Sequence, residues 1–280
     1  GLGVELAKRF GGEIVSADSR QVYRGLDLGT GKVTEEEMEG VPHHMLDVVE
    51  PNQPYSVAEF QAGAYAAIDG ILSRGNTPFL VGGTGLYVRA VTEGFTFTDA
   101  RPAPALRAEL EGKTTAELYA LLREKTGVTL TDGEEFNRQR LMRSVEKALS
   151  GQWESPPPRP RYDCLLLGVT FPRDVVCRRI DERLQARLDA GMAEEVAALR
   201  AGGADDSFLE GLGLEYRYIL WYLTGKIPTL DALKDELGRA IKRFAKRQMV
   251  WFQKDRDVLW LDMEGDFLTQ AVRAVEDFLA

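Results

Sequence analysis

The sequence has few of the residues that mark secreted, zinc-binding or membrane proteins. Only two cysteines and two histidines occur among its 280 residues. Cys164 and Cys177 lie among apolar or helical residues, and no CxxC or Cys/His spacing indicates zinc, so we expect reduced thiols in a cytosolic protein. No apolar run reaches the roughly 18 residues that a membrane span needs, and the first residues do not resemble a signal peptide. We therefore expect a cytoplasmic location and no membrane partner.

Two motifs of phosphate chemistry are also missing. No segment matches the phosphate-loop pattern GxxxxGK[ST]. Gly29-Thr30-Gly31-Lys32 resembles part of it, but a leucine stands five positions before the second glycine and a valine follows the lysine. The aspartate-rich motif DDxxD does not occur either, because Asp205-Asp206 has no aspartate at the required spacing. This second absence argues against the enzymes that elongate terpenoid chains.

The chain as a whole is acidic. Its 44 acidic and 35 basic residues give a formal net charge of -9, which argues mildly against nucleic acid as a partner. Binding depends on local charge rather than on the total, so the basic segments need separate consideration. With 44% hydrophobic residues, a chain of this length can bury a large core.

Short apolar runs alternate with helical patterns along most of the chain. The runs cover residues 14–15, 77–81, 164–169 and 258–261. Strands that are apolar on both faces and alternate with helices are typical of a parallel sheet covered on each side. Residues 99–155 differ, because helical segments without a strand lie there between two proline-rich joints. We predict an α/β core of residues 1–98 and 156–280, with an inserted helical domain of residues 99–155.

Polar side chains follow two of these runs directly. Asp18 comes shortly after the first run, and Thr84 follows the second through Gly82-Gly83. In open α/β sheets ligands bind beyond the carboxyl ends of the strands, so Asp18 and Thr84 are expected at one ligand-binding edge. The local sequence also allows a plainer interpretation, in which Asp18, Ser19 and Thr84 only cap the helices that follow.

Three arginines recur at helical spacing. Arg179, Arg183 and Arg187 form one cationic face at positions i, i+4 and i+8. Arginine suits a diphosphate, because a guanidinium can bind phosphate oxygens bidentately. A solvated helix face paired with the acidic residues of the same segment is the better explanation for most of them.

Two further segments are basic. Residues 239–247 (RAIKRFAKR) hold five basic residues and no acid. A second set lies in the predicted insertion and comprises Arg138, Arg140, Arg143 and Lys147. Two such surfaces indicate a polyanion held between the core and the insertion, although a charged helix face without function has the same pattern. Residues 213–218 place aromatics and an arginine beside glycines, which suits base stacking and ordinary packing equally.

Several segments are distinctive and occur in a fixed order. They are VSADSRQVYRGLDLGTGK, VPHHMLDVVEP, YSVAEF, PFLVGGTGLYVRAV, NRQRLMRSVE, RIDERL, GMAEEVAAL, EYR and KRFAKRQMVWF. Together they resemble the tRNA dimethylallyltransferases, the isopentenyltransferases that modify adenosine 37 beside the anticodon. The resemblance covers nearly the whole chain. No zinc-finger extension of the eukaryotic kind is present, which favours a bacterial-type member.

The resemblance implies a P-loop-type α/β core with a helical insertion, a flipped adenine, dimethylallyl diphosphate as donor, and Mg²⁺. It implies that Asp18 takes the proton of adenine N6, that Thr84 lies beside the adenine, and that an arginine matching Arg183 helps diphosphate to leave. The residues expected to contact tRNA are Asp18, Ser19, Arg20, Gln21, Thr84, Arg107, Gln139, Arg140, Leu141, Met142, Arg143, Gly213, Leu214, Glu215, Tyr216, Arg217, Tyr218, Lys242, Arg243, Lys246 and Arg247. We expect a monomer.

The sequence departs from the family's pattern in three places. The phosphate loop, whose lysine and Ser/Thr hold diphosphate and Mg²⁺, is expected immediately before Gly1, so no magnesium ligand is assigned here. Glu215 stands where the family usually has glycine, and Ile241-Lys242 replaces a commoner Thr-Arg pair. Two alternatives follow: an RNA-binding protein on a P-loop scaffold without catalysis, and a nucleotide kinase of related core.

Overall fold

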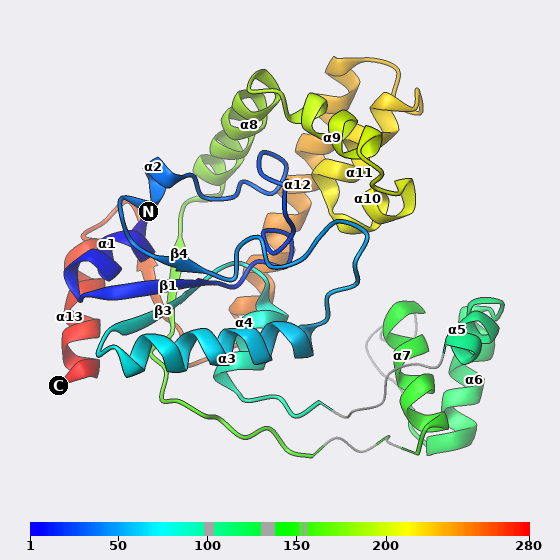
Figure 1. Ribbon diagram of the computed structural model, residues 1–280, viewed down its shortest axis with the longest axis horizontal. Helices are drawn as coiled ribbons and strands as arrows, with labels where there is room; N and C mark the ends of the chain where they lie inside the picture. Colours follow the sequence, from blue (N-terminus) through cyan, green and yellow to red (C-terminus); the bar gives the residue numbers. More distant parts are fainter. Residues whose placement is uncertain (98–103, 130–137, 152, 154–155) are drawn as a thin grey trace. The chain divides into compact units, whose positions relative to one another are not determined.

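The computed structural model describes residues 1–97, 104–129, 138–151, 153 and 156–280. The chain folds as two compact units (Figure 1). The first unit comprises residues 1–92 and 161–280, and the second comprises residues 93–160. The predicted insertion of residues 99–155 falls within the second unit.

The first unit contains five strands, all paired in parallel. A three-stranded sheet has the order β2-β1-β3, and a separate pair joins β4 to β5. The strands are β1 (Gly12–Ser16), β2 (His43–His44), β3 (Thr77–Val81), β4 (Leu167–Thr170) and β5 (Leu259–Asp262). The predicted α/β class with parallel strands is confirmed. Strand β4 begins three residues later than the apolar run at 164–169, and β5 begins one residue later than the run at 258–261.

Helices cover both faces of β1, which is buried along its whole length. Helix α1 (Leu2–Arg9) packs against Ile14, whereas α3 (Val57–Ser73) and α4 (Gly85–Thr92) pack against Val15. Figure 1 shows α3 running along the three-stranded sheet. Coverage is less complete on the other strands, where Val81 of β3, Val169 of β4 and Leu259 of β5 are exposed.

A layer of helices packs against the chain that follows β1. These helices are α8 (Arg173–Asp189), α9 (Met192–Ala201), α10 (Asp206–Leu212), α11 (Leu214–Leu223) and α12 (Leu230–Phe252). Their apolar side chains form one core with Val22, Tyr23 and Leu26. The residues just after β1 are therefore held between the sheet and this helical layer. Two more helices complete the unit, α2 (Glu35–Met38) and α13 (Phe267–Leu279).

The second unit is helical in its described part. It contains α5 (Pro104–Glu111), α6 (Thr115–Thr126) and α7 (Arg138–Leu149). Helix α6 begins with a capping box between Thr114 and Glu117. Leucines of all three helices form its core. Across the described ranges of both units, none of the helices combines the length and the apolar character that crossing a bilayer requires.

Candidate functional site

The turn after β1 and the start of α4 are joined at one edge of the sheet. Strands β1 and β3 are neighbours, and Ser16 pairs with Val81 at the ends of the two strands. The backbone N–H of Ser19 donates a hydrogen bond to Thr84 Oγ1 over 3.0 Å, and that of Thr84 donates to the carbonyl of Ala17 over 3.2 Å. The shared edge that the sequence predicts for Asp18 and Thr84 is therefore present.

Asp18 does not cap a helix. Its Oδ1 accepts hydrogen bonds from the backbone N–H groups of Arg20 (2.8 Å) and Gln21 (3.4 Å), which closes a local turn. No helix follows before α2 at Glu35, so the capping interpretation of Asp18 is wrong. Within the described ranges Oδ2 of Asp18, a half-buried residue, accepts no hydrogen bond and is left for a ligand.

Gln21 connects β1 to a glycine-rich loop. Its Nε2 donates to the carbonyl of Gly31 over 3.1 Å, and its Oε1 accepts from Ser16 Oγ over 3.2 Å. The lysine of this loop is Lys32, whose side chain is 7% exposed and lies 2.6 Å from both Asp27 and Asp47. Lys32 is thus engaged by two aspartates within the fold, which agrees with the failed phosphate-loop pattern.

Three arginines of the first unit lie near this turn. Burial lowers the pKa of Arg20, and Asp18 opposes that shift. Burial also lowers the pKa of Arg187, and Arg183 one helical turn away adds to the effect. An anionic ligand is favoured here, because its charge would offset the burial of Arg20 and Arg187 and the repulsion between Arg187 and Arg183.

The arginine face is solvated at Arg179 and Arg183, as the plainer interpretation expects, but two of the acids in its segment have other partners. Asp181 is paired with Lys242 at 2.6 Å, and Asp189 accepts a hydrogen bond from Gln185. In the described part of the chain neither Arg183 nor Arg187 forms an ion pair. Arg183 is exposed, so its guanidinium is accessible to a ligand.

In the segment from Gly213 to Tyr218, most side chains that the sequence offers for RNA contact pack or bond within the fold. Tyr216 is buried, and its hydroxyl donates to Glu195 Oε1 over 2.8 Å, so stacking of its ring on a base is excluded. Leu214 packs against the helical core, and Tyr218 packs 5.1 Å from the ring of Trp221. Arg217 donates through Nε to the carbonyl of Glu210 over 2.7 Å.

Glu215 introduces a carboxylate at the start of α11. Burial raises the pKa of this carboxyl, Arg187 and Arg183 oppose the shift, and Asp18 adds to it. Glu215 is therefore close enough to Asp18, Arg183 and Arg187 to interact with their charges. Gly213, two residues before it, approaches Arg20, because a Cβ on Gly213 would lie 3.6 Å from Arg20 Nε.

The end of α12 approaches the glycines that precede α4. Gln248 donates through Nε2 to the carbonyl of Gly83 over 2.6 Å, a contact that the sequence analysis missed. Of the four predicted basic residues on this helix, Lys242 is the one paired with Asp181, and the other three are exposed. Those three are Arg243, Lys246 and Arg247.

The predicted tRNA contacts of the second unit fall into two groups. Leu141 and Met142 are 1% and 6% exposed and belong to the core, so contact of these two side chains with RNA is excluded. Arg107 and Arg143 flank the buried carboxylate of Glu146, at 3.8 Å and 3.2 Å. Arg140 is exposed on α7, and the side chain of Gln139 lies outside the described part of the structure.

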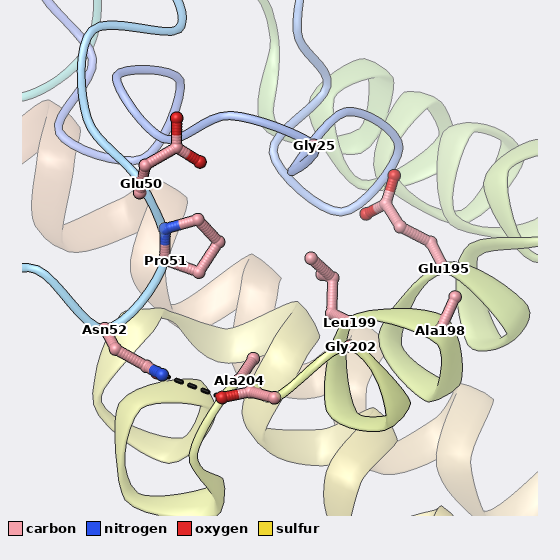
Figure 2. Close-up of a pocket in the computed structure, with 10 residues that line it drawn as sticks. Gly25, Glu50, Pro51, Asn52, Glu195, Ala198, Leu199, Gly202 and Ala204 are labelled. Carbon is pink, nitrogen blue, oxygen red and sulfur yellow. Dashed lines mark hydrogen bonds between the residues drawn. The ribbon is translucent and has the colours of Figure 1, made fainter.

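A separate pocket lies between the loop at residues 50–52 and α9. Its volume is about 490 Å³, and its lining includes Glu50, Asn52 and Glu195 but no cation (Figure 2). Asn52 bridges its rim, donating to the carbonyl of Gly203 over 2.8 Å. Two carboxylates without a cation make this pocket unsuitable for a diphosphate.

A complete metal site is not formed by the residues that the structure describes. These residues hold no group of three or more His, Cys, Asp or Glu side chains that could bind a metal ion. Asp18 and the hydroxyls of Ser19 and Thr84 offer oxygen atoms, which Mg²⁺ prefers, and one carboxylate fits this ion when waters and substrate phosphates supply its other ligands.

Comparisons with known proteins all lead to the same family of transferases. A family model described as IPP transferase matches residues 21–255. The chain is 42% identical to tRNA dimethylallyltransferase 2 of Shewanella sediminis, over 99% of this chain and 93% of that protein. It is similar to the crystal structure of the full-length tRNA isopentenylpyrophosphate transferase from Bacillus halodurans, with a TM-score of 0.73, 36% identity, and coverage of 99% and 90%.

A eukaryotic dimethylallyltransferase acting on tRNA has the same fold. Its structure aligns with a TM-score of 0.82 and 23% identity, over 99% of this chain and 75% of that one. At this identity the likeness concerns the fold alone.

Proposed function

The chain belongs to the IPP transferase family, and we propose on that basis that it is a tRNA dimethylallyltransferase. The proposed reaction transfers a dimethylallyl group from dimethylallyl diphosphate to N6 of adenosine 37 in the tRNA anticodon loop. The observation that carries the proposal is the hydrogen bond between Ser19 and Thr84, which brings Asp18 and Thr84 to one sheet edge in a chain of this family.

Asp18 is proposed as the general base. The exocyclic N6 amine of adenine is a poor nucleophile, so its proton must leave as the new N–C bond forms. N6 attacks C1 of the dimethylallyl group, the C1–O bond breaks, and diphosphate departs with the electron pair. The proton passes from N6 to the carboxylate of Asp18, whose Oδ2 is available to accept it. The adenine must leave the base stack to reach this position.

The arginines near the turn are proposed to hold the diphosphate. Negative charge increases on the leaving diphosphate as the C1–O bond breaks, and fixed cations stabilise that charge. Arg183 is exposed, and Arg187 lies one helical turn further along α8. Arg20 lies two residues after Asp18, whose charge opposes the lowering of its pKa by burial, so a third cation lies close to the proposed base.

The exposed basic residues of α12 and of the second unit are proposed to contact the tRNA backbone. Arg243, Lys246 and Arg247 on α12, together with Arg140 on α7, supply positive charge on a chain of net charge -9. Phosphate contacts of this kind give affinity that falls as salt rises. The other contacts inferred from the resemblance stay predictions.

Mg²⁺ stays a prediction from the resemblance. The described residues do not complete a site for it, and the steps above assign no role to a metal. The cytoplasmic location and the monomeric state are likewise predictions.

The direct test is transfer of a labelled dimethylallyl group to unmodified tRNA by the protein expressed from its complete gene, in the presence of Mg²⁺. Asp18→Asn is expected to slow single-turnover transfer by roughly 10²- to 10⁴-fold while tRNA affinity stays within about threefold, as removal of a general base predicts. Asp257→Asn, an exposed aspartate in a loop, is the matched control. Tight tRNA binding without transfer by the wild type would favour the RNA-binding alternative.

A further inference from the structure

Glu195 binds a loop that is distant in sequence. It lies in the first turn of α9, and its carboxylate accepts hydrogen bonds from three consecutive backbone N–H groups. These are Asp27 (3.0 Å) and Leu28 (2.7 Å) to Oε2, and Gly29 (3.1 Å) to Oε1. Oε1 also accepts the hydroxyl of Tyr216 over 2.8 Å. Figure 2 shows the carboxylate directed from α9 toward the loop near Gly25.

The bound loop, residues 26–32, reaches the candidate site at its other end. The carbonyl of Gly31 accepts the hydrogen bond from Gln21. Gly31 has a φ of +61°, and a side chain on it would collide with the guanidinium of Arg187. The loop therefore contacts both a residue of the Asp18 turn and an arginine of the cationic group.

Tyr216 fixes the same loop from a second side. A Cβ on Gly29 would lie 2.5 Å from Cζ of Tyr216, so the backbone of the loop rests directly on the phenol ring. Burial first, and then Glu195, raises the pKa of the Tyr216 hydroxyl, which keeps it a hydrogen-bond donor. Tyr216 belongs to α11, in whose first turn Glu215 lies within the electrostatic influence of Arg187 and Arg183.

The four donors require an ionised carboxylate. A carboxylate has two oxygens and about four lone-pair sites and donates nothing, so it can accept from three N–H groups and one O–H at once. A carboxamide has a single acceptor oxygen, and its NH₂ group would face N–H donors. Bonds to an ionised acceptor are also stronger than neutral ones.

We propose that Glu195 is a positioning residue for the transfer reaction: through residues 26–32 and Tyr216 it holds Arg187 in the place where it binds the diphosphate of the donor. This inference rests on the proposed function, because it assigns Arg187 to the donor. Glu195 touches neither donor nor adenine and acts only through the loop.

The first test compares Glu195→Gln with Glu194→Gln. Both variants remove one negative charge from the first turn of α9, but Glu194 is exposed and has no bond to the loop. We expect Glu195→Gln to weaken binding of dimethylallyl diphosphate, measured by calorimetry, by about tenfold, the equivalent of one charge-assisted hydrogen bond. Affinity for tRNA should change by less than about twofold, and Glu194→Gln should match the wild type in both.

Hydrogen exchange of the amides of Asp27, Leu28 and Gly29 gives a readout that does not depend on catalysis. Their protection should fall by at least about tenfold in Glu195→Gln and stay unchanged in Glu194→Gln. Glu195→Asp, which keeps the charge on a shorter side chain, should give intermediate values and serves if the glutamine variant does not fold. Unchanged protection in a folded variant would show that the carboxylate does not hold the loop.

A double-mutant cycle with Arg187→Lys separates positioning from general stabilisation. If Glu195 acts through Arg187, adding Glu195→Gln to Arg187→Lys should weaken donor binding by no more than about threefold. Two independent tenfold losses that multiply would overturn the proposal. A wild type that binds the donor but transfers nothing would contradict the proposed function, and the exchange and binding measurements would still decide the role of Glu195.

Discussion

The backbone N–H of Ser19 and the hydroxyl of Thr84 are 3.0 Å apart, although 65 positions separate the two residues in the sequence. Thr84 Oγ1 in turn donates to Ser19 Oγ over 3.3 Å. The hydroxyl of Thr84 therefore bonds to the turn that carries Asp18, while its carbonyl accepts the backbone N–H of Val88 in the first turn of α4. The side chain of Thr84 thus fixes the distance between the proposed base, Asp18, and α4, the helix that follows the neighbouring strand β3.

Loss of the Thr84 hydroxyl should slow transfer by releasing this turn. We expect Thr84→Ala to lower the single-turnover rate by roughly 10- to 100-fold, since a small displacement of catalytic groups is costly, and to destabilise the fold by about 1 kcal/mol. Thr84→Ser keeps the hydroxyl and should retain the rate within about threefold. Equal rates for the alanine and serine variants would show that the hydroxyl has no part in placing Asp18.

Arg183 should contribute to binding of the donor, dimethylallyl diphosphate, and Arg179 should not. Both are exposed on α8, but Arg179 lies over the ring of Phe171, 4.5 Å from its centroid, whereas Arg183 precedes Arg187 by one turn. We expect Arg183→Met to weaken dimethylallyl diphosphate binding by about tenfold or more, the loss of one charge-assisted contact. Arg179→Met is the control, and a similar loss in both variants would indicate only a general effect of charge.

Neighbouring residues of α7 should separate stability from RNA binding. Leu141→Ala removes a buried side chain and should destabilise the second unit by about 2–5 kcal/mol, measured by denaturant unfolding. Arg140→Ala should leave that stability within about 0.5 kcal/mol and reduce the salt dependence of tRNA binding by about one phosphate contact. An unchanged salt slope for Arg140→Ala would remove this residue from the tRNA interface.

Glu13 should make stability depend on pH in the acid range. Its side chain is 6% exposed, and hydrogen bonds from Arg74, Asn76 and His44 lower the pKa of the carboxyl to about 2. Because the folded-state pKa is lowered, the stabilisation is complete above the ordinary value of 4.5 and is lost as the pH falls through about 2. We expect about 2 kcal/mol at pH 7, allowing for solvent screening at Arg74, which is 50% exposed.

The measurement for Glu13 is the free energy of unfolding of the wild type and of Glu13→Gln between pH 2 and 7. The difference between the two proteins should shrink toward zero as the pH falls, because the protonated glutamate and the glutamine then make similar bonds. Glu36→Gln, an exposed residue of α2, should follow the wild type throughout. A difference that does not change with pH would contradict the assigned cause.

The parts of the fold that local chemistry decides were predictable. The capping box that starts α3 needs only Ser56 and Glu59, three positions apart in the sequence, and β3 occupies the predicted residues 77–81. The edge shared by Asp18 and Thr84 followed from parallel strands alone. Strand β4 was placed too early, because the apolar character of Cys164 to Leu166 does not reveal where pairing with β5 begins.

Contacts between distant segments were beyond the sequence. Glu195 and Gln248 reach loops about 166 and 165 positions away, and nothing in their own neighbourhoods marks them. Tyr216 shows a different difficulty, because the sequence around an aromatic residue beside glycines fits either a ligand contact or a place in the core. In the structure its ring packs in the core and its hydroxyl donates to Glu195. The burial of the Leu141 and Met142 side chains was also beyond the sequence, because a motif does not reveal which faces of a helix are buried.

The bond between Glu195 and the loop at residues 26–32 also bears on how the protein is made. At the roughly 5–20 residues per second of translation, the carboxylate is synthesised about 8–33 s after the loop that it will hold. Throughout that interval the amides of Asp27, Leu28 and Gly29 have water as their partner. The strand and turn that precede the loop can form early on the ribosome, whereas the cationic half of the site is assembled only when α9 and α11 have emerged.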